Sequence, residues 1–178
     1  SQGSGIFVYN SNLIKKVYFP REILPISSVT AGLINFLISC IIIVIFVLLG
    51  GVGLSWHLIF LPLLAVIQYI FTLALVFLIS SINVYVRDVE YIVVFILNML
   101  FYATPVLYSY EMFEGTKLIW LFRLNPMAHL INAYRDIFYV HQIPQLMNLL
   151  VVFVCSIILL IICYLIFKKL EKRFAEEL

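Results

Sequence analysis

The residues best suited to binding chemistry lie in a basic segment near the start of the chain, residues 12–25. Lys15, Lys16 and Arg21 carry cationic groups that can contact acidic side chains of a protein partner or lipid phosphates. Directly after this segment, residues 23–86 contain no Lys, Arg, Asp or Glu. The pattern predicts a binding element that leads into a long membrane-embedded stretch.

A short amphipathic helix is predicted within this segment, and Pro20 must end it near Phe19. Pro20 and Pro25 fix φ and so stiffen the connection to the apolar stretch that follows. Two interpretations stay open: an interfacial anchor on anionic lipid, or a docking element for a cytoplasmic partner. Apolar residues spaced i, i+1, i+4 and i+5 form one face of the predicted helix, namely Leu13, Ile14, Val17 and Tyr18.

Catalytic and metal-binding motifs find little support in the sequence. His57, His129 and His141 stand without an HxxxH or carboxylate pairing, and no cysteine cluster has metal-ligand spacing. No GxxxxGK[ST] loop is present, so this chain is not expected to bind ATP, and no cofactor is expected on it. We predict no catalytic residue, no metal ligand and no nucleic-acid partner.

Composition predicts an all-α membrane protein. Hydrophobic residues make up 65% of the chain and charged residues 11%, and the mean hydropathy is +1.14, whereas roughly 25% of an average chain is charged. Helices of roughly 20 apolar residues cross a bilayer and satisfy their own backbone groups. Four such helices are predicted, at about residues 29–49, 58–82, 91–110 and 146–167.

The positive charges predict the orientation, because Lys and Arg near span ends are retained in the cytoplasm. With four spans, the N-terminal segment, the middle turn and the C-terminus share one side. Three positive residues lie on the other side: Lys117, Arg123 and Arg135. Eight lie on the shared side: Lys15, Lys16, Arg21, Arg87, Lys168, Lys169, Lys172 and Arg173. Both ends of the chain are therefore expected in the cytoplasm.

A stripe of aromatic and polar residues follows one face of the third predicted span. At about 100° per residue, the members fall within a sector of about 80°: Tyr91, Phe95, Asn98, Tyr102 and Pro105. Aromatic faces can slide along sugar rings, so the stripe could line a translocation path for a glycan. The alternative is a helix–helix interface in which Asn98 hydrogen-bonds a neighbouring span.

The outer segment, residues 111–143, is too apolar for a free loop. Asn125 followed by Pro126 predicts a helix cap with proline at the first helical position. The apolar residues that follow, Tyr134 among them, keep helical spacing through Phe138, whereas Arg135 and Asp136 lie on another face. An amphipathic helix lying on or dipping into the outer leaflet is expected.

Three motifs resemble the permease subunit of ABC-2 type exporters, in particular the branch that exports polysaccharide. These motifs are residues 12–25, the sequence NVYVRDV at 83–89, and Leu124-Asn-Pro126 followed by Tyr134-Arg-Asp136. The resemblance implies six spans, of which the four visible here are the third to sixth. An N-terminal truncation is therefore expected, and residues 1–178 form a single transmembrane domain.

The same resemblance implies roles for several elements. A coupling helix at about residues 6–19 would contact an ABC ATPase, the separate subunit expected to bind ATP and magnesium. Residues 13–21, Phe19 and Pro20 included, would carry this contact. Arg87 and Asp88 would give either a second ATPase contact or a polar turn that supports topology. The outer helix would act as a gate formed by Asn125, Pro126, Tyr134, Arg135 and Asp136, or would be a passive interfacial helix.

The function expected from the resemblance is transport. A homodimeric permease in the bacterial cytoplasmic membrane, driven by ATPase subunits, would move a lipid-linked polysaccharide such as O-antigen, capsule or teichoic acid. The alternatives are export of a drug or small lipid and, less favoured, a membrane-embedded transferase acting on lipid-linked sugars. An ion-coupled transporter is disfavoured because the predicted spans hold no ionisable residue.

Overall fold

The computed structural model describes residues 2–16, 19–51, 53, 56–104 and 125–177, and its regular elements are helices. Within these ranges, three helical stretches are long and apolar enough to cross a membrane: Ile23–Leu49, Trp56–Tyr85 and Leu146–Arg173. A shorter apolar helix covers Val89–Tyr102. The predicted span 91–110 runs past the described residues, so the count of four spans stays a prediction.

The first long helix, α3 (Ile23–Leu49), begins several residues before the predicted span 29–49. Pro25 therefore lies in the first turn of the helix and not in a separate connection. A proline is tolerated there because the first backbone N–H groups of a helix have no intrahelical acceptor. The helix ends at Gly50, and Gly51 follows with φ of 73°, which glycine adopts without strain.

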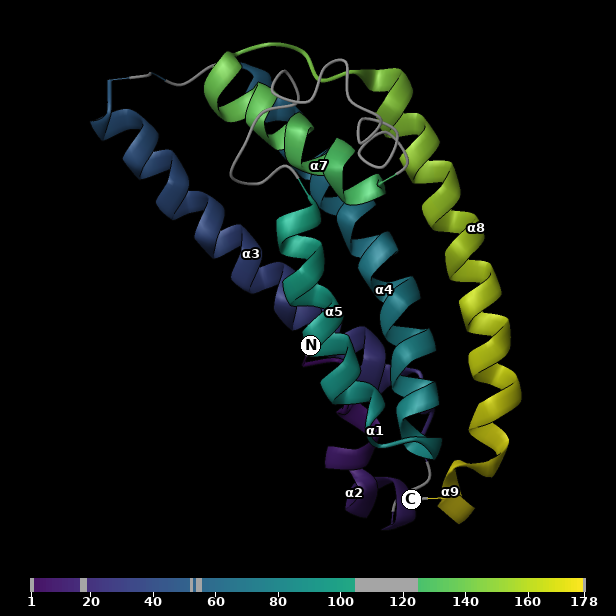
Figure 1. The fold of residues 1–178 in the computed structure, drawn as a ribbon. Helices are drawn as coiled ribbons and strands as arrows, with labels where there is room; N and C mark the ends of the chain where they lie inside the picture. The colour runs from purple at the N-terminus through teal and green to yellow at the C-terminus, as the bar shows by residue number, and fades with distance from the viewer. Residues whose placement is uncertain (1, 17–18, 52, 54–55, 105–124, 178) are drawn as a thin grey trace.

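The centre of the bundle is α4 (Leu61–Tyr85), which follows the 3₁₀ helix η1 (Trp56–Phe60). It packs along α8 (Leu146–Leu170) on one side and against α3 on another (Figure 1). Near the end that carries η1, α3 diverges from α4 (Figure 1). The most extensive contact between any two described helices is therefore that between α4 and α8.

Two apolar clusters hold the opposite ends of this bundle. One end, which we call the basic end, carries Lys15, Lys16 and Lys168 near a cluster centred on Phe7, Phe167 and other residues of α3, α4 and α8. The other, which we call the far end, has α7 (Pro126–Arg135) and the π-helical turn η3 (Asp136–Val140) lying across it (Figure 1). The far-end cluster joins these elements to α4 and α8 and contains Leu64, Ile67, Leu130, Ala133, Ile137, Leu149 and Val152.

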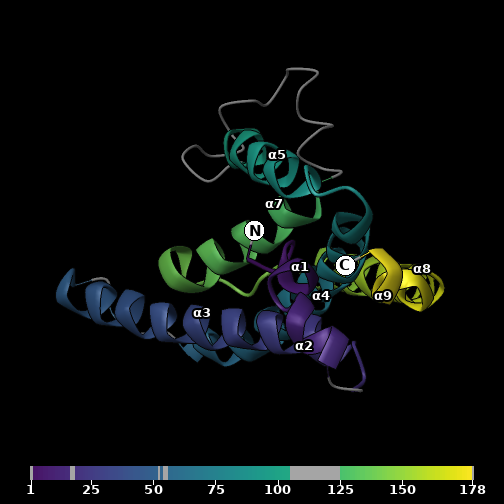
Figure 2. The same ribbon diagram turned by 90° about the horizontal axis from the view of Figure 1, so that it is seen from below.

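The helix α5 (Val89–Ala103) stands apart from the other long helices when the molecule is viewed from the basic end (Figure 2). None of its described side chains is buried. It leaves the bundle after the turn that ends α4, where Val86 adopts an extended conformation. The described chain thus contains one helix that presents nearly its whole circumference to the surroundings.

Where one helix is expected over residues 6–19, the structure has two short helices, α1 (Ile6–Tyr9) and α2 (Ser11–Lys16). Asn10 separates them, and its side-chain amide donates a hydrogen bond to the Ile6 carbonyl over 2.8 Å. Asparagine often interrupts helices in this way because its side chain competes for backbone groups. Residues 17 and 18 lie outside the described residues.

At the C-terminus, α8 continues through the 3₁₀ turn η4 (Glu171–Arg173) into α9 (Phe174–Glu177), which lies at the same end of the molecule as α1 and α2 (Figure 1). Phe174 is fully buried, with its ring centroid 5.0 Å from that of Phe7 and 6.1 Å from that of Phe167. A ring from the end of the chain therefore completes the cluster at the basic end.

Removing this ring should weaken the basic end. We expect Phe174→Ala to destabilise the fold by about 3 kcal/mol, the usual cost of truncating a buried phenylalanine, and to lower the apparent melting temperature of the detergent-solubilised protein. Phe46→Ala is the matched control, because the Phe46 side chain is 68% exposed. Equal melting temperatures for the two variants would contradict the packing described above.

Candidate functional site

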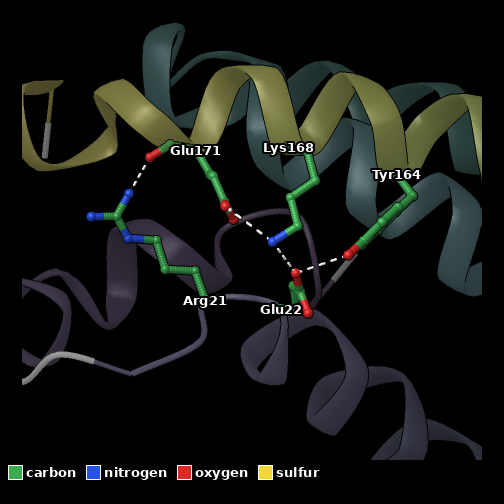
Figure 3. Close-up of polar contacts among 5 residues, drawn as sticks. All are labelled: Arg21, Glu22, Tyr164, Lys168 and Glu171. Carbon is green, nitrogen blue, oxygen red and sulfur yellow. Dashed lines mark hydrogen bonds and ion pairs between the residues drawn. The ribbon is translucent and has the colours of Figure 1, made fainter.

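A network of polar contacts joins the start of α3 to the end of α8 at the basic end (Figure 3). The Glu22 carboxylate forms an ion pair with the Lys168 ammonium and accepts a hydrogen bond from the Tyr164 hydroxyl over 3.0 Å. The same ammonium lies 3.1 Å from the Glu171 carboxylate. Arg21 donates to the backbone carbonyl of Glu171. The segment entering α3 is therefore fixed to α8 through two consecutive residues.

The charge state of Glu22 follows from these contacts. The hydrogen bond from Lys168 holds the pKa of the Glu22 carboxyl below its ordinary value, and Tyr164 acts in the same direction, whereas partial desolvation opposes them. A lowered pKa in the folded state means that the carboxylate stabilises the fold above the ordinary carboxyl pKa. That contribution is lost as the pH falls through the lowered pKa, so the pair is charged at neutral pH.

Aromatic packing reinforces the same junction. The Arg21 guanidinium lies 5.9 Å from the centroid of the Phe174 ring, and the Lys168 ammonium lies 5.8 Å from that of Tyr164. Such cation–π contacts add to the polar network. The Tyr85 hydroxyl at the end of α4 donates to the Leu170 carbonyl over 2.9 Å. Three helix ends and the C-terminal tail thus meet at one point.

The short helix α2 presents a mixed surface above this junction. Lys15 and Lys16 are exposed, Leu13 is 44% exposed and Ile14 is buried against the cluster below. The predicted apolar face is therefore divided, because Ile14 packs inward and Leu13 points outward. Val17 and Tyr18, the other two members of that face, lie outside the described residues.

A hollow of about 740 Å³ lies between α2, the connection to α3 and the end of α8. Cationic side chains outnumber anionic ones among its lining residues, which are Ile14, Lys15, Lys16, Phe19, Pro20, Arg21, Lys168, Glu171 and Lys172. All the described residues of the predicted coupling contact between Ile14 and Arg21 line this hollow. The arrangement suits an acidic or polar partner surface rather than a small apolar molecule.

The turn between α4 and α5 lies at the basic end as well. Arg87 and Asp88 are exposed there, and Asp88 precedes the first residue of α5 without a capping side-chain hydrogen bond. The Asn83 side chain, which is only 1% exposed, accepts from the Glu90 backbone N–H over 3.1 Å. A buried amide of α4 therefore fixes the first turn of α5.

The predicted path stripe lies on α5. Tyr91 is 77% exposed, Phe95 63% and Tyr102 71%, and Asn98 is exposed as well. Pro105 lies outside the described residues. The described part of the stripe is therefore accessible along its length, as either a path lining or an interface with a further helix would require.

At the far end, α7 begins with the predicted cap. The Asn125 side chain accepts from the Met127 backbone N–H over 3.0 Å, and Pro126 lies in the first turn. The Asn125 amide also donates to the Thr104 hydroxyl over 3.2 Å. This contact connects α7 to the end of α5.

The apolar face of α7 packs against protein instead of lying free. Leu130 is buried between α4 and α8, and the Tyr134 hydroxyl donates to the Gln68 side chain of α4 over 2.8 Å. Burial raises the pKa of the Asp136 carboxyl, and the charge of the neighbouring Arg135 opposes the rise. The five predicted gate residues thus gather on α7 and its immediate ends.

Several residues at these sites carry no role in the sequence analysis. Glu22, Tyr164 and Glu171 belong to the network, Phe174 to the cluster and Gln68 to the attachment of α7. Opposite charges at the ends of two predicted spans on the same side of the membrane were a usable signal for Glu22 and Lys168. No comparable signal was available for Phe174, because a partner for a lone aromatic is set by tertiary packing.

Charge reversal tests the network directly. We expect Lys168→Glu to lower the apparent melting temperature in detergent, because it places a third carboxylate between Glu22 and Glu171. Adding Glu22→Lys should recover part of the loss. Lys169→Glu is the control, since Lys169 is the exposed neighbour with the same charge. A Lys168→Glu protein as stable as this control would show that the network contributes nothing.

Sequence comparison relates this chain to a family of membrane transporters. The family model of the ABC-2 type transporter matches residues 4–139. An O-antigen export system permease protein RfbA from Myxococcus xanthus is 36% identical over 169 residues, which is 94% of this chain and 65% of that protein. Two proteins of the same name from Klebsiella pneumoniae are 35% and 34% identical over 174 residues, which is 97% of this chain and 66% of each of them.

The chain thus spans slightly less than two thirds of the length of these relatives. The family model nevertheless covers most of the chain, including α1 to α5 and α7. Together with the apolar helices, this match confirms the resemblance seen in the sequence motifs. The chain belongs to the ABC-2 type transporter family.

Proposed function

We propose that this chain is part of the permease subunit of an ATP-driven exporter that moves a lipid-linked polysaccharide across the bacterial cytoplasmic membrane. The observation that carries the proposal is the similarity, over nearly the whole chain, to proteins named as O-antigen export permeases. O-antigen, capsular and teichoic-acid chains share the features of a long glycan on a lipid carrier. The polysaccharide class is therefore proposed, and not one named glycan.

The basic end would face the cytoplasm and receive the ATPase subunit. Its exposed Lys15 and Lys16, the outward Leu13 and the cation-lined hollow form a surface that suits acidic groups on a soluble partner. Arg21 already binds Glu171 and Phe174 within the chain. We therefore assign the ATPase contact chiefly to α2, and assign Arg21 to holding α2 in place against α8.

The path would run along α5. An exposed stripe of Tyr91, Phe95, Asn98 and Tyr102 offers flat apolar faces for sugar rings and an amide for transient hydrogen bonds to hydroxyls. A second copy of the permease would enclose the other side of the path. The α7 residues would act as a gate near the outer face. The Tyr134–Gln68 hydrogen bond would hold α7 against α4.

The ATPase contact can be tested by reversing the two exposed charges of α2. We expect Lys15→Glu combined with Lys16→Glu to weaken association with the ATPase by about tenfold or more, because like charges facing each other cost several kcal/mol. The strength of this association is measured by co-purification of the complete permease with its ATPase at several salt concentrations. The control variant with Lys15→Arg and Lys16→Arg retains both charges and should bind the ATPase as the wild type does. Unchanged binding by the variant with both lysines replaced by glutamate would refute the assignment of the contact to α2.

The cargo can be tested by reconstitution. The complete permease, co-expressed with its ATPase and placed in lipid vesicles, should hydrolyse ATP faster when a lipid-linked glycan is present. Vesicles containing the lipid carrier without its glycan are the control. Turnover that responds to a drug or small lipid but not to the glycan would support the other branch of the family, and absence of a stable complex would refute the ATPase-driven mechanism itself.

A further inference from the structure

The helix that carries the proposed path is weakly held by the rest of the described chain. No described side chain of α5 is buried, and α5 stands apart from α3 and α8 in the view from the basic end (Figure 2). By contrast, α8 packs along α4 through both apolar clusters. A single contact at the base of α5 can therefore influence its position more strongly than a comparable contact could influence α8.

Such a contact joins α5 to the N-terminal segment. The Tyr9 hydroxyl, at the end of α1, donates a hydrogen bond to the Glu90 carboxylate in the first turn of α5. The backbone N–H of the same Glu90 is bound by the buried Asn83 side chain of α4. Glu90 is thus held from two elements, and the next residue, Tyr91, begins the aromatic stripe.

Gly5 lies beside this contact, and a side chain at that position would collide with the Tyr9 and Glu90 side chains. A Cβ added to Gly5 would lie 2.5 Å from Cε2 of Tyr9 and 2.8 Å from Oε2 of Glu90. Gly5 itself has φ of −89° and ψ of 7°, which alanine tolerates. An alanine there would therefore act by pushing the Tyr9 and Glu90 side chains away and not by straining the backbone.

We propose that Tyr9 and Glu90 form a positioning pair through which movement of the N-terminal segment 6–16 is passed to α5. The inference rests on the proposed function, in which the ATPase contacts α2. Asn10 connects α1 to α2: its side-chain amide donates to the Ile6 carbonyl of α1, and its own carbonyl accepts from the Leu13 and Ile14 backbone N–H groups of α2. We expect the two short helices to move together because both are bound to this residue. Displacement of α2 then shifts Tyr9, and the hydrogen bond draws the first turn of α5 with it. The aromatic stripe moves relative to α4 and α8, which the apolar clusters hold together.

The variants that test the pair each change one small chemical group of a side chain. Tyr9→Phe removes only the hydroxyl, and Gly5→Ala separates the two side chains. Glu90→Gln keeps an oxygen that can accept from Tyr9 and should retain most of the coupling. Gly32→Ala is the matched control for the added methyl, because nothing lies within 4 Å of a Cβ at Gly32.

The experiment uses the complete permease with its ATPase in lipid vesicles and measures co-purification, ATP turnover and glycan transported per ATP hydrolysed. We expect Tyr9→Phe and Gly5→Ala to co-purify and hydrolyse ATP as the wild type does. The glycan moved per ATP should fall about fivefold or more, within the usual range for coupling between two sites. Glu90→Gln and Gly32→Ala should stay near the wild-type ratio.

A second measurement does not depend on the cargo. Hydrogen–deuterium exchange of the wild-type complex should change in both the N-terminal segment and α5 when a non-hydrolysable ATP analogue binds. In Tyr9→Phe the change should be confined to the N-terminal segment. The same response of α5 in wild type and variant would overturn the positioning role.

The outcomes separate the two proposals. A wild-type complex that fails to form refutes the proposed function, and this inference with it. A wild-type complex that transports glycan, beside a Tyr9→Phe variant with an unchanged transport ratio, refutes the positioning pair alone. Loss of co-purification in Tyr9→Phe would likewise overturn the positioning role, because the pair would then be needed for the permease to assemble with its ATPase.

Discussion

The absence of Lys, Arg, Asp and Glu from all but the ends of the long helices constrains the rest of this structure. Between Glu22 and Arg87 the chain has no Lys, Arg, Asp or Glu, and α8 has none before Lys168. A charge within a bilayer is costly, so charged contacts must form where the helices leave the membrane. Dispersion and small polar contacts hold the middle of the bundle, and the directional contacts gather at its two ends.

This constraint explains why the basic end is a junction of so many elements. The start of α3, the ends of α4 and α8, the first turn of α5 and the C-terminal tail all reach the same level of the structure (Figure 1). Charges internal to the junction, such as Glu22 with Lys168, bind the elements to one another. Lys15 and Lys16 point outward instead. The chain thus separates the cations that hold its fold from those that can meet a partner.

The N-terminal segment is joined to the membrane helices in three physically different ways. It continues covalently into α3, it packs on α4 and α8 through the apolar cluster that contains Phe7 and Phe167, and it reaches α5 through the Tyr9–Glu90 hydrogen bond. Packing of buried rings resists separation in many directions, whereas a hydrogen bond from an exposed tyrosine constrains one distance. A push on this segment would therefore move the helices that it contacts unequally.

Much of the architecture could be read from the chain alone. The apolar runs predicted long helices, because only self-satisfied backbone is stable in lipid, and Asn125 followed by Pro126 predicted the start of α7 correctly. The sequence motifs likewise predicted the family, which the comparison confirms. Local patterns carry this information because periodicity and capping involve residues close together in sequence.

The tertiary structure decided which distant residues meet. Glu22 could have paired with any cation at the basic end, and only the packing of α3, α4 and α8 brings it to Lys168 and Tyr164. The same is true of Phe174 beneath Phe7 and of Tyr9 beside Glu90. The sequence determined that the chain lies in a membrane, where its three long apolar helices run and which end is basic. Helix packing determined which of its charged and aromatic residues hold the fold and which remain exposed, because those contacts depend on crossing angles and heights that no local pattern encodes.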